Sequence, residues 1–465
     1  MNWDQEEEEE YNLSLSRFEA MLKTNKVLFF DSEEFENIIL HYFDNGKINL
    51  AKKALKLGLE QHPKSVGLKL VQVEIFIYEN KLDIAEKMLN DLYEIEPENE
   101  EIYIQKANIQ SKKGNHSKAV ELLEIALQYT DDYADVYSLI GMEYLFMDEL
   151  EKAKENFIKC LNEDGDDYSS LYNVVYCFDF MEQHPEGIKF LKEFIDNNPY
   201  SEVAWHQLGR QYYAIKNYEE AVKAFDYAIV IDESFLGAYM EKGKSLERLK
   251  RYDEAIKCYN QTLELDDPTA YAFLRIGKCY EKLDFKDLAI KQYRKAITED
   301  PLLEKAWLAI IDIYVLQNKL KQALSYIDKA LDIDPENDNY WKRYSTINYA
   351  LEHYDLAFEG CRKAINSGCT ELGLYFMYAD MSISYDEVDS AIEALINILL
   401  VFPNSSEIEY RLAGLLFSKN DIVNATYYCT NALINDFDGH TILSDHYPEV
   451  MKMPEVLDLI EKHRK

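Results

Sequence analysis

Apolar residues in the stretch 202–235 follow two helical faces separated by a polar pair. The first half carries large apolar residues and a glycine at spacings of three, one and three, and the second half repeats apolar residues at spacings of four and three. Each set marks one face of a helix, and the Lys216-Asn217 pair between them suits a tight turn. The positions are Trp205, Leu208, Gly209 and Tyr212, then Ala221, Phe225 and Ala228. We predict a helix–turn–helix hairpin, which cannot bury its apolar faces alone.

This hairpin resembles the tetratricopeptide repeat, a unit of 34 residues. If Glu202 is position 1, the apolar residues fall on the signature positions 4, 7, 8, 11, 20, 24 and 27 of that family. The residue types are those that the family prefers. One departure is position 32, where the family has proline and this hairpin has Glu233.

The same register extends through most of the chain in steps of 34 residues. Position 20 is then occupied by eleven alanines and one glycine, without insertion or deletion. Position 32 is proline in six of the repeats. The position-20 residues are Ala51, Ala85, Ala119, Ala153, Gly187, Ala221, Ala255, Ala289, Ala323, Ala357, Ala391 and Ala425. This series predicts twelve repeats from Ser32 to about Gly439.

The resemblance implies an all-α fold. In the family the hairpins stack into an α-solenoid that forms a right-handed superhelix, with the first helix of each repeat lining the concave face. We expect three parts: an acidic lead with a capping helix at 1–31, the twelve repeats at 32–439, and a C-terminal cap at 440–465. The last helix of this cap is expected to begin at Pro454. The first helices are expected to start at Ser32, Val66, Glu100, Ala134, Tyr168, Glu202, Leu236, Ala270, Glu304, Asp338, Leu372 and Ser406.

Glycines recur at position 8 of several repeats. Gly209, Gly243 and Gly277 would each sit inside a helix, where glycine costs about 1 kcal/mol relative to alanine. We expect close packing between the two helices of the hairpin to offset that cost, because any side chain there would hold them apart.

The chain is strongly acidic. It has 50 Lys+Arg and 86 Asp+Glu, a formal net charge of −36, which disfavours nucleic acid and anionic membrane surfaces. Its seven cysteines form no CxxC pair, and three of them, Cys160, Cys361 and Cys429, fall on packing positions, as is typical of buried thiols in a reducing cytoplasm. The N-terminus lacks the features of a signal peptide, and no run of 18 apolar residues exists to span a membrane.

The run Glu6–Glu10 allows two interpretations. It can be a solvated, mobile acidic lead, or an interaction tail for a basic partner. Phe18, Met21 and Leu22 follow it on one apolar face and predict the capping helix.

Known catalytic motifs are absent from the sequence. It has no GxSxG, P-loop, HExxH or glycine-rich dinucleotide loop, and its nine histidines show no metal-binding spacing. We therefore expect no enzyme, no cofactor and no metal.

A binding surface is expected on the first helices, because extended concave surfaces are what solenoids offer. The family's groove is lined mainly by positions 2, 5, 9 and 12 of each first helix. Arg210, Lys244 and Lys278 fall at position 9 of successive repeats and predict a basic row flanked by tyrosines. An alternative is that they pair with Glu247, Glu281 and neighbouring acids. The candidate groove residues are Tyr172, Tyr176, His206, Arg210, Tyr213, Lys244, Tyr271 and Lys278.

The N-terminal repeats present a different set at these positions. Glu33, Glu36, Leu70, Glu74, Ile77 and Ile104 make it acidic and apolar. Such a surface suits another partner or another subunit.

We interpret the chain as a cytoplasmic, non-enzymatic scaffold that binds an extended, acidic polypeptide segment through charge-assisted hydrogen bonds and tyrosine contacts. The alternatives are a structural protein that self-associates and a regulatory subunit of a larger complex. In each case the partner is another protein or peptide, without nucleic acid or membrane insertion.

Overall fold

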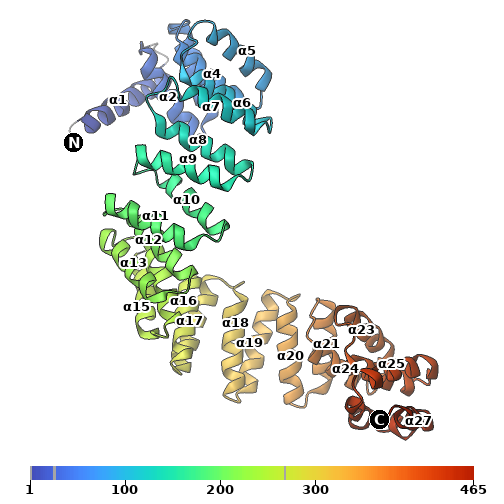
Figure 1. Ribbon diagram of the computed structural model, residues 1–465. Coiled ribbons are helices and arrows are strands. Elements are labelled where there is room, and N and C mark those ends of the chain that lie inside the picture. The colour runs from blue at the N-terminus through green and yellow to red at the C-terminus, as the bar shows by residue number, and fades with distance from the viewer. Residues whose placement is uncertain (1–2, 25–27, 266–268, 465) are drawn as a thin grey trace. The chain divides into compact units, whose positions relative to one another are not determined.

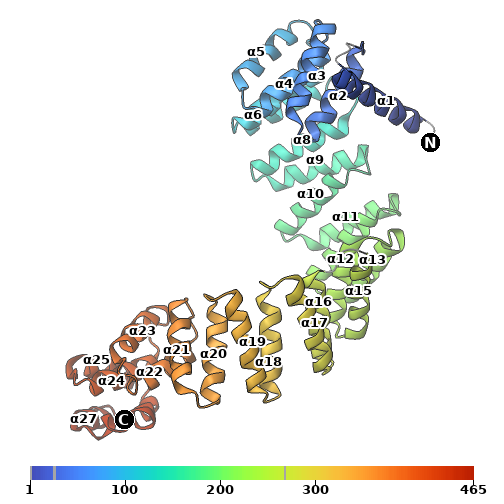
Figure 2. The same ribbon diagram turned by 180° about the vertical axis from the view of Figure 1, so that it is seen from behind.

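The chain folds entirely into helices wherever its structure is described. The computed structural model describes residues 3–24, 28–265 and 269–464, with side chains from residue 13 onward, and these residues contain no β-strand. Consecutive antiparallel helix pairs follow one another along the chain (Figures 1 and 2). They fall into two compact units, Met1–Glu241 and Lys242–Lys465, which are treated separately below.

The first unit contains an N-terminal helix and six hairpins, and ends within α14 (Leu236–Arg248). The N-terminal helix is α1 (Trp3–Thr24). The hairpins are α2 (Ser32–Asp44) with α3 (Ile48–Gln61), α4 (Val66–Tyr78) with α5 (Leu82–Tyr93), α6 (Glu100–Lys112) with α7 (His116–Ala126), α8 (Tyr133–Phe146) with α9 (Leu150–Glu163), α10 (Tyr168–Phe180) with α11 (His184–Asn197), and α12 (Glu202–Ala214) with α13 (Tyr218–Ile231).

The second unit continues the series and ends in shorter helices. Its hairpins are α14 with α15 (Tyr252–Leu265), α16 (Ala270–Lys282) with α17 (Lys286–Glu299), α18 (Glu304–Leu316) with α19 (Leu320–Ile333), α20 (Asp338–Ala350) with α21 (Tyr354–Asn366), α22 (Leu372–Ser382) with α23 (Val388–Val401), and α24 (Ser406–Ser418) with α25 (Ile422–Asn435). After them come η1 (Asp438–His440), α26 (Thr441–His446), η2 (Val450–Lys452) and α27 (Pro454–His463).

The prediction of an all-α array of twelve 34-residue hairpins is confirmed. Eleven of the twelve first helices begin at the predicted residue, and α8 begins one residue earlier, at Tyr133. All eleven alanines at position 20 are 0% exposed, so this position is the invariant contact point between neighbouring helices. A larger side chain there would push the helices apart.

The glycines at position 8 face an aromatic ring at position 24 of the same hairpin. A Cβ on Gly209 would lie 2.5 Å from the Phe225 ring, and one on Gly277 would lie 2.5 Å from the Tyr293 ring. Gly141 with Phe157 and Gly243 with Tyr259 repeat this arrangement at 2.6 Å. The other eight hairpins have a non-aromatic residue at position 24 and a larger residue at position 8. The expected close packing is therefore confirmed, and its cause is the ring.

The turn inside each hairpin requires a left-handed backbone at position 15. Twelve residues with φ between 56° and 75° occupy this position, one per hairpin. Only two of them are glycines, although left-handed geometry costs a non-glycine residue about 1 kcal/mol or more. They are Gly46, Asn80, Gly114, Asp148, Glu182, Lys216, Lys250, Asp284, Asn318, Glu352, Asp386 and Asn420.

Aromatic residues at position 4 tie each of several hairpins to the preceding turn. The Trp307 indole N–H donates to the Pro301 carbonyl at 2.9 Å, and the Tyr103 hydroxyl donates to the Pro97 carbonyl at 2.8 Å. Trp205, Trp341 and Tyr375 make the same bond to the carbonyl six residues upstream. The position-32 residue thus supplies an acceptor as well as a turn.

The N-terminal helix α1 covers the first hairpin. Phe18 is 0% exposed and packs edge-to-face against Phe35 at 6.3 Å between ring centroids. Arg17 pairs with Glu34 at 3.0 Å. The run Glu6–Glu10 belongs to α1, but its side chains lie outside the described part of the chain.

We predict that Gly277→Ala lowers the free energy of unfolding by about 1 kcal/mol, because overpacking against Tyr293 outweighs the gain in helix propensity. In the background of Tyr293→Leu the same change should instead raise stability, since alanine already accompanies leucine in the pair Ala107 and Leu123. Gly373→Ala, which meets no atom within 4 Å, is the control and should stabilise. Urea unfolding measures the stability of all four variants. If Gly277→Ala changed the free energy of unfolding in the same direction in both backgrounds, the Tyr293 ring would not be the cause.

The turn geometry yields a second prediction. Glu352→Gly should raise the free energy of unfolding by roughly 0.5–1 kcal/mol, because Glu352 has a φ of 61° and glycine removes the strain. Gly114→Ala should lower it by about 1 kcal/mol, since no atom crowds that position and only the backbone is affected. The midpoints of urea unfolding measure both effects. A Glu352→Gly midpoint equal to that of wild type would show that the left-handed backbone at Glu352 is not strained.

Candidate functional site

Three aromatic residues of α10 share one helix face in the first unit. Tyr172, Tyr176 and Phe180 are four residues apart and are 43%, 51% and 62% exposed. The Tyr176 and Phe180 ring centroids are 6.0 Å apart. We call these residues the aromatic stripe. Tyr172 and Tyr176 are predicted groove residues; Phe180 is not, although its four-residue spacing from Tyr176 could have indicated it.

Arg210 of α12 is held by residues of its own unit. Its guanidinium lies 3.7 Å from the Asp179 carboxylate and donates to the Gln207 side chain at 3.0 Å. Asp179 also accepts a hydrogen bond from the Gln211 amide at 2.5 Å. Arg210 thus has an acidic neighbour in the preceding repeat.

Tyr213, another predicted groove residue, packs edge-to-face on Tyr218, with ring centroids 5.2 Å apart.

His206 lies beneath the surface of α12. It is 9% exposed, with its ring centroid 5.6 Å from that of Phe225 and 4.9 Å from that of Phe235. Neither ring nitrogen has a partner with hydrogen-bond geometry in the described structure, although the Gly237 backbone is close. Burial, together with the charge of Arg210, lowers the pKa of His206 to about 4, against the opposing influence of Glu241.

Carboxylates follow one another along the first helices α4, α6 and α8 of the same unit. Glu74, Glu101 and Asp135 occupy positions 9, 2 and 2 of successive repeats. Burial is the largest cause of a raised pKa at each of them, and the next carboxylate in the series raises each pKa further. Asp167, which caps α10, is the neighbour that acts on Asp135. We call these four residues the acidic row.

In the second unit, Tyr271 brings two cations together. Lys244 Nζ lies 5.8 Å from the centre of the Tyr271 ring, and the Arg275 guanidinium lies at the same distance. Tyr271 is 41% exposed. Lys244 and Tyr271, both predicted groove residues, are therefore neighbours, and cation–π attraction holds the cluster.

Glu247 neutralises Arg275. Its carboxylate accepts from Arg275 Nε at 2.8 Å and from the Tyr259 hydroxyl at 2.6 Å. Glu281 accepts from Tyr293 at 2.8 Å in the next hairpin. Glu247 and Glu281 are thus engaged by other groups, and both also lie within electrostatic reach of Lys278.

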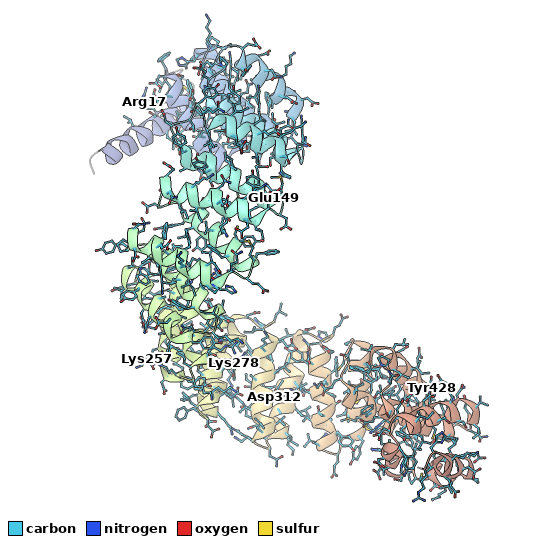
Figure 3. The ribbon with its side chains drawn as sticks, in the orientation of Figure 1. Arg17, Glu149, Lys257, Lys278, Asp312 and Tyr428 are labelled. Atoms are coloured by element: carbon cyan, nitrogen blue, oxygen red, sulfur yellow. The ribbon has the colours of Figure 1, made fainter. Side chains whose placement is uncertain are left out.

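Unlike Arg210, Lys278 forms no hydrogen bond or ion pair with any residue that the structure describes. It is half-buried on α16 (Figure 3). Burial, followed by the charges of Arg275 and Lys305, lowers the pKa of Lys278 against the opposing influence of Glu247 and Glu281. This side chain is therefore a partly desolvated cation available for an anion.

The chain's own C-terminal segment packs on position 9 of the last two first helices, the repeat position that Lys278 occupies in α16. Tyr447 is 2% exposed and packs so closely on Gly414 of α24 that a Cβ there would collide with its ring. Its hydroxyl donates to Asp380 of α22 at 3.4 Å, and His446 pairs with Asp380 at 3.0 Å. Gly414 and Asp380 both occupy position 9, so these positions are not open to a partner.

Three features of the residues that the structure describes bear on other chemistry: metal-binding groups, membrane-spanning helices and cysteines. They contain no group of three or more His, Cys, Asp or Glu side chains placed to hold a metal ion. No helix among them has the length and apolar character needed to cross a bilayer. The seven cysteines form no disulfide within the described structure and are all buried, and burial raises the pKa of Cys160 to about 12.

Sequence models of known families decide the classification. Those described as "Tetratricopeptide repeat" match residues 76–142, 134–167, 203–235, 237–268 and 274–338. The chain belongs to the tetratricopeptide repeat family. The predicted resemblance is thereby confirmed.

Two curated relatives align with part of this tetratricopeptide repeat chain. "Anaphase-promoting complex subunit 3" of Schizosaccharomyces pombe is 24% identical over 157 residues, which are 34% of this chain and 24% of that protein. "Cell division cycle protein 27 homolog" of Caenorhabditis elegans is 29% identical over 92 residues, which are 20% of this chain and 12% of that protein. The chain therefore matches a quarter or less of either relative's length.

Solved repeat structures are similar at a coarser level. The "Crystal structure of MamA protein" is 23% identical, with 37% of this chain and 94% of that chain covered and a TM-score of 0.33. The "Crystal structure of APC/C hetero-tetramer Cut9-Hcn1" is 13% identical, with 99% and 95% covered and a TM-score of 0.31. Similarities of this size carry no conclusion about function.

The burial of His206 predicts a pH-dependent stability. Its folded-state pKa of about 4 lies below the ordinary value of 6.5, so the fold excludes the protonated ring. This contribution is fully present above about pH 6.5 and is lost as the pH falls toward 4, by roughly 1–3 kcal/mol. His206→Met, the residue at the same position of the next repeat, should remove it.

Urea unfolding of both proteins at pH 7.5 and pH 4.5 tests this prediction. The comparison with His206→Met cancels the carboxylates that titrate in the same range. Wild type should lose more stability than the variant on acidification. Equal losses would show that His206 is protonated freely in the folded state.

Proposed function

We propose that this chain is a non-enzymatic scaffold that binds other proteins, and that its second unit holds an extended, acidic or carboxylate-bearing segment on the first helices α14, α16 and α18. The candidate contacts there are Lys244, Tyr271 and Lys278. Of the candidates in the first unit, Tyr172, Tyr176, Arg210 and Tyr213 remain candidate surface contacts, and His206 is assigned beneath them. The cytoplasm is the proposed compartment.

The observation that carries this proposal is the state of Lys278. A cation that is half-buried without an acidic partner, beside Arg275 and Lys305, is stabilised when a carboxylate enters. Charge-assisted hydrogen bonds to such a carboxylate are the strong kind. Tyr271, exposed beside it, offers a large contact at low entropy cost.

Membership of a larger complex is the second candidate role. The family's extended surfaces support it, as does the printed name of one relative, a subunit of the anaphase-promoting complex. Self-association is the remaining alternative. Light scattering over a concentration series separates them, since a self-assembling scaffold gains mass with concentration and a monomeric subunit does not.

We predict that Lys278→Gln weakens binding of a fluorescein-labelled, glutamate- and tyrosine-containing peptide by about tenfold, the loss of one charge-assisted hydrogen bond. Lys257→Gln is the matched control, because it removes the same charge from an exposed site on α15; Figure 3 labels the two lysines on opposite sides of this part of the stack. The control should bind within about twofold of wild type.

Fluorescence anisotropy with the full chain measures both affinities. Equal losses in the two variants would mean that the peptide responds only to net charge. Unchanged binding by Lys278→Gln would remove Lys278 from the site.

A further inference from the structure

We infer that the first unit carries a binding face of the opposite preference, for a positively charged polypeptide segment with apolar side chains, formed by the acidic row and the aromatic stripe. This inference is independent of the acidic-segment site in the second unit. Of the acidic and apolar groove positions expected from the sequence in the N-terminal repeats, this face includes Glu74.

The aromatic stripe is an apolar surface that the described residues of its unit leave exposed. Tyr172, Tyr176 and Phe180 are all more than 40% exposed, and they occupy positions 5, 9 and 13 of one first helix. Positions 5 and 9 face the groove in the family. Three aromatic side chains in line along one helix face offer apolar contact along an extended partner.

Charge decides which partner the stripe accepts. The helices α8 and α10 contain nine aromatic residues and three carboxylates but no lysine or arginine. Across the first unit, residues 1–241 carry 49 Asp+Glu against 23 Lys+Arg. A net charge of −26 attracts a basic segment and repels an acidic one.

The acidic row gives this attraction a location. No ion pair with lysine, arginine or histidine forms at Glu74, Glu101 or Asp135 within the described structure, and Glu101 accepts only from the Gln105 amide, at 2.6 Å. The cations of α6 are used elsewhere: Lys106 lies over the Tyr93 ring, and Lys112 donates to the Ile77 carbonyl at 3.0 Å.

Glu74 and Glu101 are partly buried and Asp135 is more exposed, and the repulsion between neighbouring carboxylates is an unfavourable electrostatic energy that a bound cation relieves. Glu74 lies within electrostatic reach of Glu101, Glu101 of Asp135, and Asp135 of Asp167. The row ends at Asp167, whose side chain accepts from the Ser169 and Ser170 amides at the start of α10. The aromatic stripe lies on α10, the helix that Asp167 caps.

The test uses a fluorescein-labelled peptide of arginine and leucine in a glycine–serine background, with the full chain and anisotropy detection. A twin peptide has glutamate in place of each arginine. The basic peptide should bind wild type and lose affinity as salt is added. The triple variant Glu74→Gln/Glu101→Gln/Asp135→Asn should weaken it by at least about tenfold, without unfolding, because the neutral amides no longer repel one another.

A second variant tests the aromatic stripe. Tyr172→Ser/Tyr176→Ser should also weaken the basic peptide by about tenfold, since stacking and apolar contacts are lost. Tyr200→Ser is its control, because Tyr200 is an 82% exposed tyrosine of the same unit outside the stripe. It should bind as wild type does.

Net charge alone is excluded by Glu121→Gln/Glu124→Gln/Glu155→Gln, which removes three exposed charges from the second helices α7 and α9. An equal loss in this control, or no binding of the basic peptide by wild type, would overturn the inference. Lys278→Gln should leave the basic peptide unaffected, so failure of this site and failure of the proposed function are distinguishable.

Discussion

The contact between the two helices of each hairpin is the constraint on which the rest of this structure depends. Alanine at position 20 is fully buried in eleven hairpins, and positions 8 and 24 together fill one fixed space. Where position 24 holds an aromatic residue, position 8 holds glycine. Where position 24 holds a non-aromatic residue, position 8 holds a residue larger than glycine. Because this spacing is kept constant, hairpins with very different surfaces stack in one register. The first helices are thereby free to vary at the positions that face a partner.

That freedom separates the chemistry of the two units. In the second unit Glu247 and Glu281 are engaged by Arg275 and tyrosine hydroxyls, which leaves Lys278 without an acidic partner in the described structure. In the first unit Glu74, Glu101 and Asp135 form no ion pair with a basic residue in the described structure, and the exposed aromatic stripe lies on α10 of the same unit. We therefore regard the chain as one scaffold with two faces of opposite charge preference. The backbone is the same, and the difference lies in a few side chains per hairpin.

Much of the fold was predictable because a strict period exposes its own register: the start of α12 at Glu202 and the role of Gly209 both follow from spacing. The site was less predictable, because it depends on which side chains of neighbouring hairpins meet. Asp179 beside Arg210 is a contact between repeats, and the burial of His206 under Phe235 joins the two ends of one repeat at positions outside the family signature. Tyr447 reaches Asp380, 67 residues upstream, after the register has ended, so no periodic signal indicates that the last inner positions are covered.

Hydrogen–deuterium exchange of the full chain with each peptide bound in turn tests the central claim most directly, because it reports on all first helices at once. The acidic peptide should slow exchange in α16 and α18, and the basic peptide should slow it in α6, α8 and α10. The second helices should be unaffected in both cases. Protection of the same helices by both peptides, or protection confined to the second helices, would contradict the account of two faces with opposite preference.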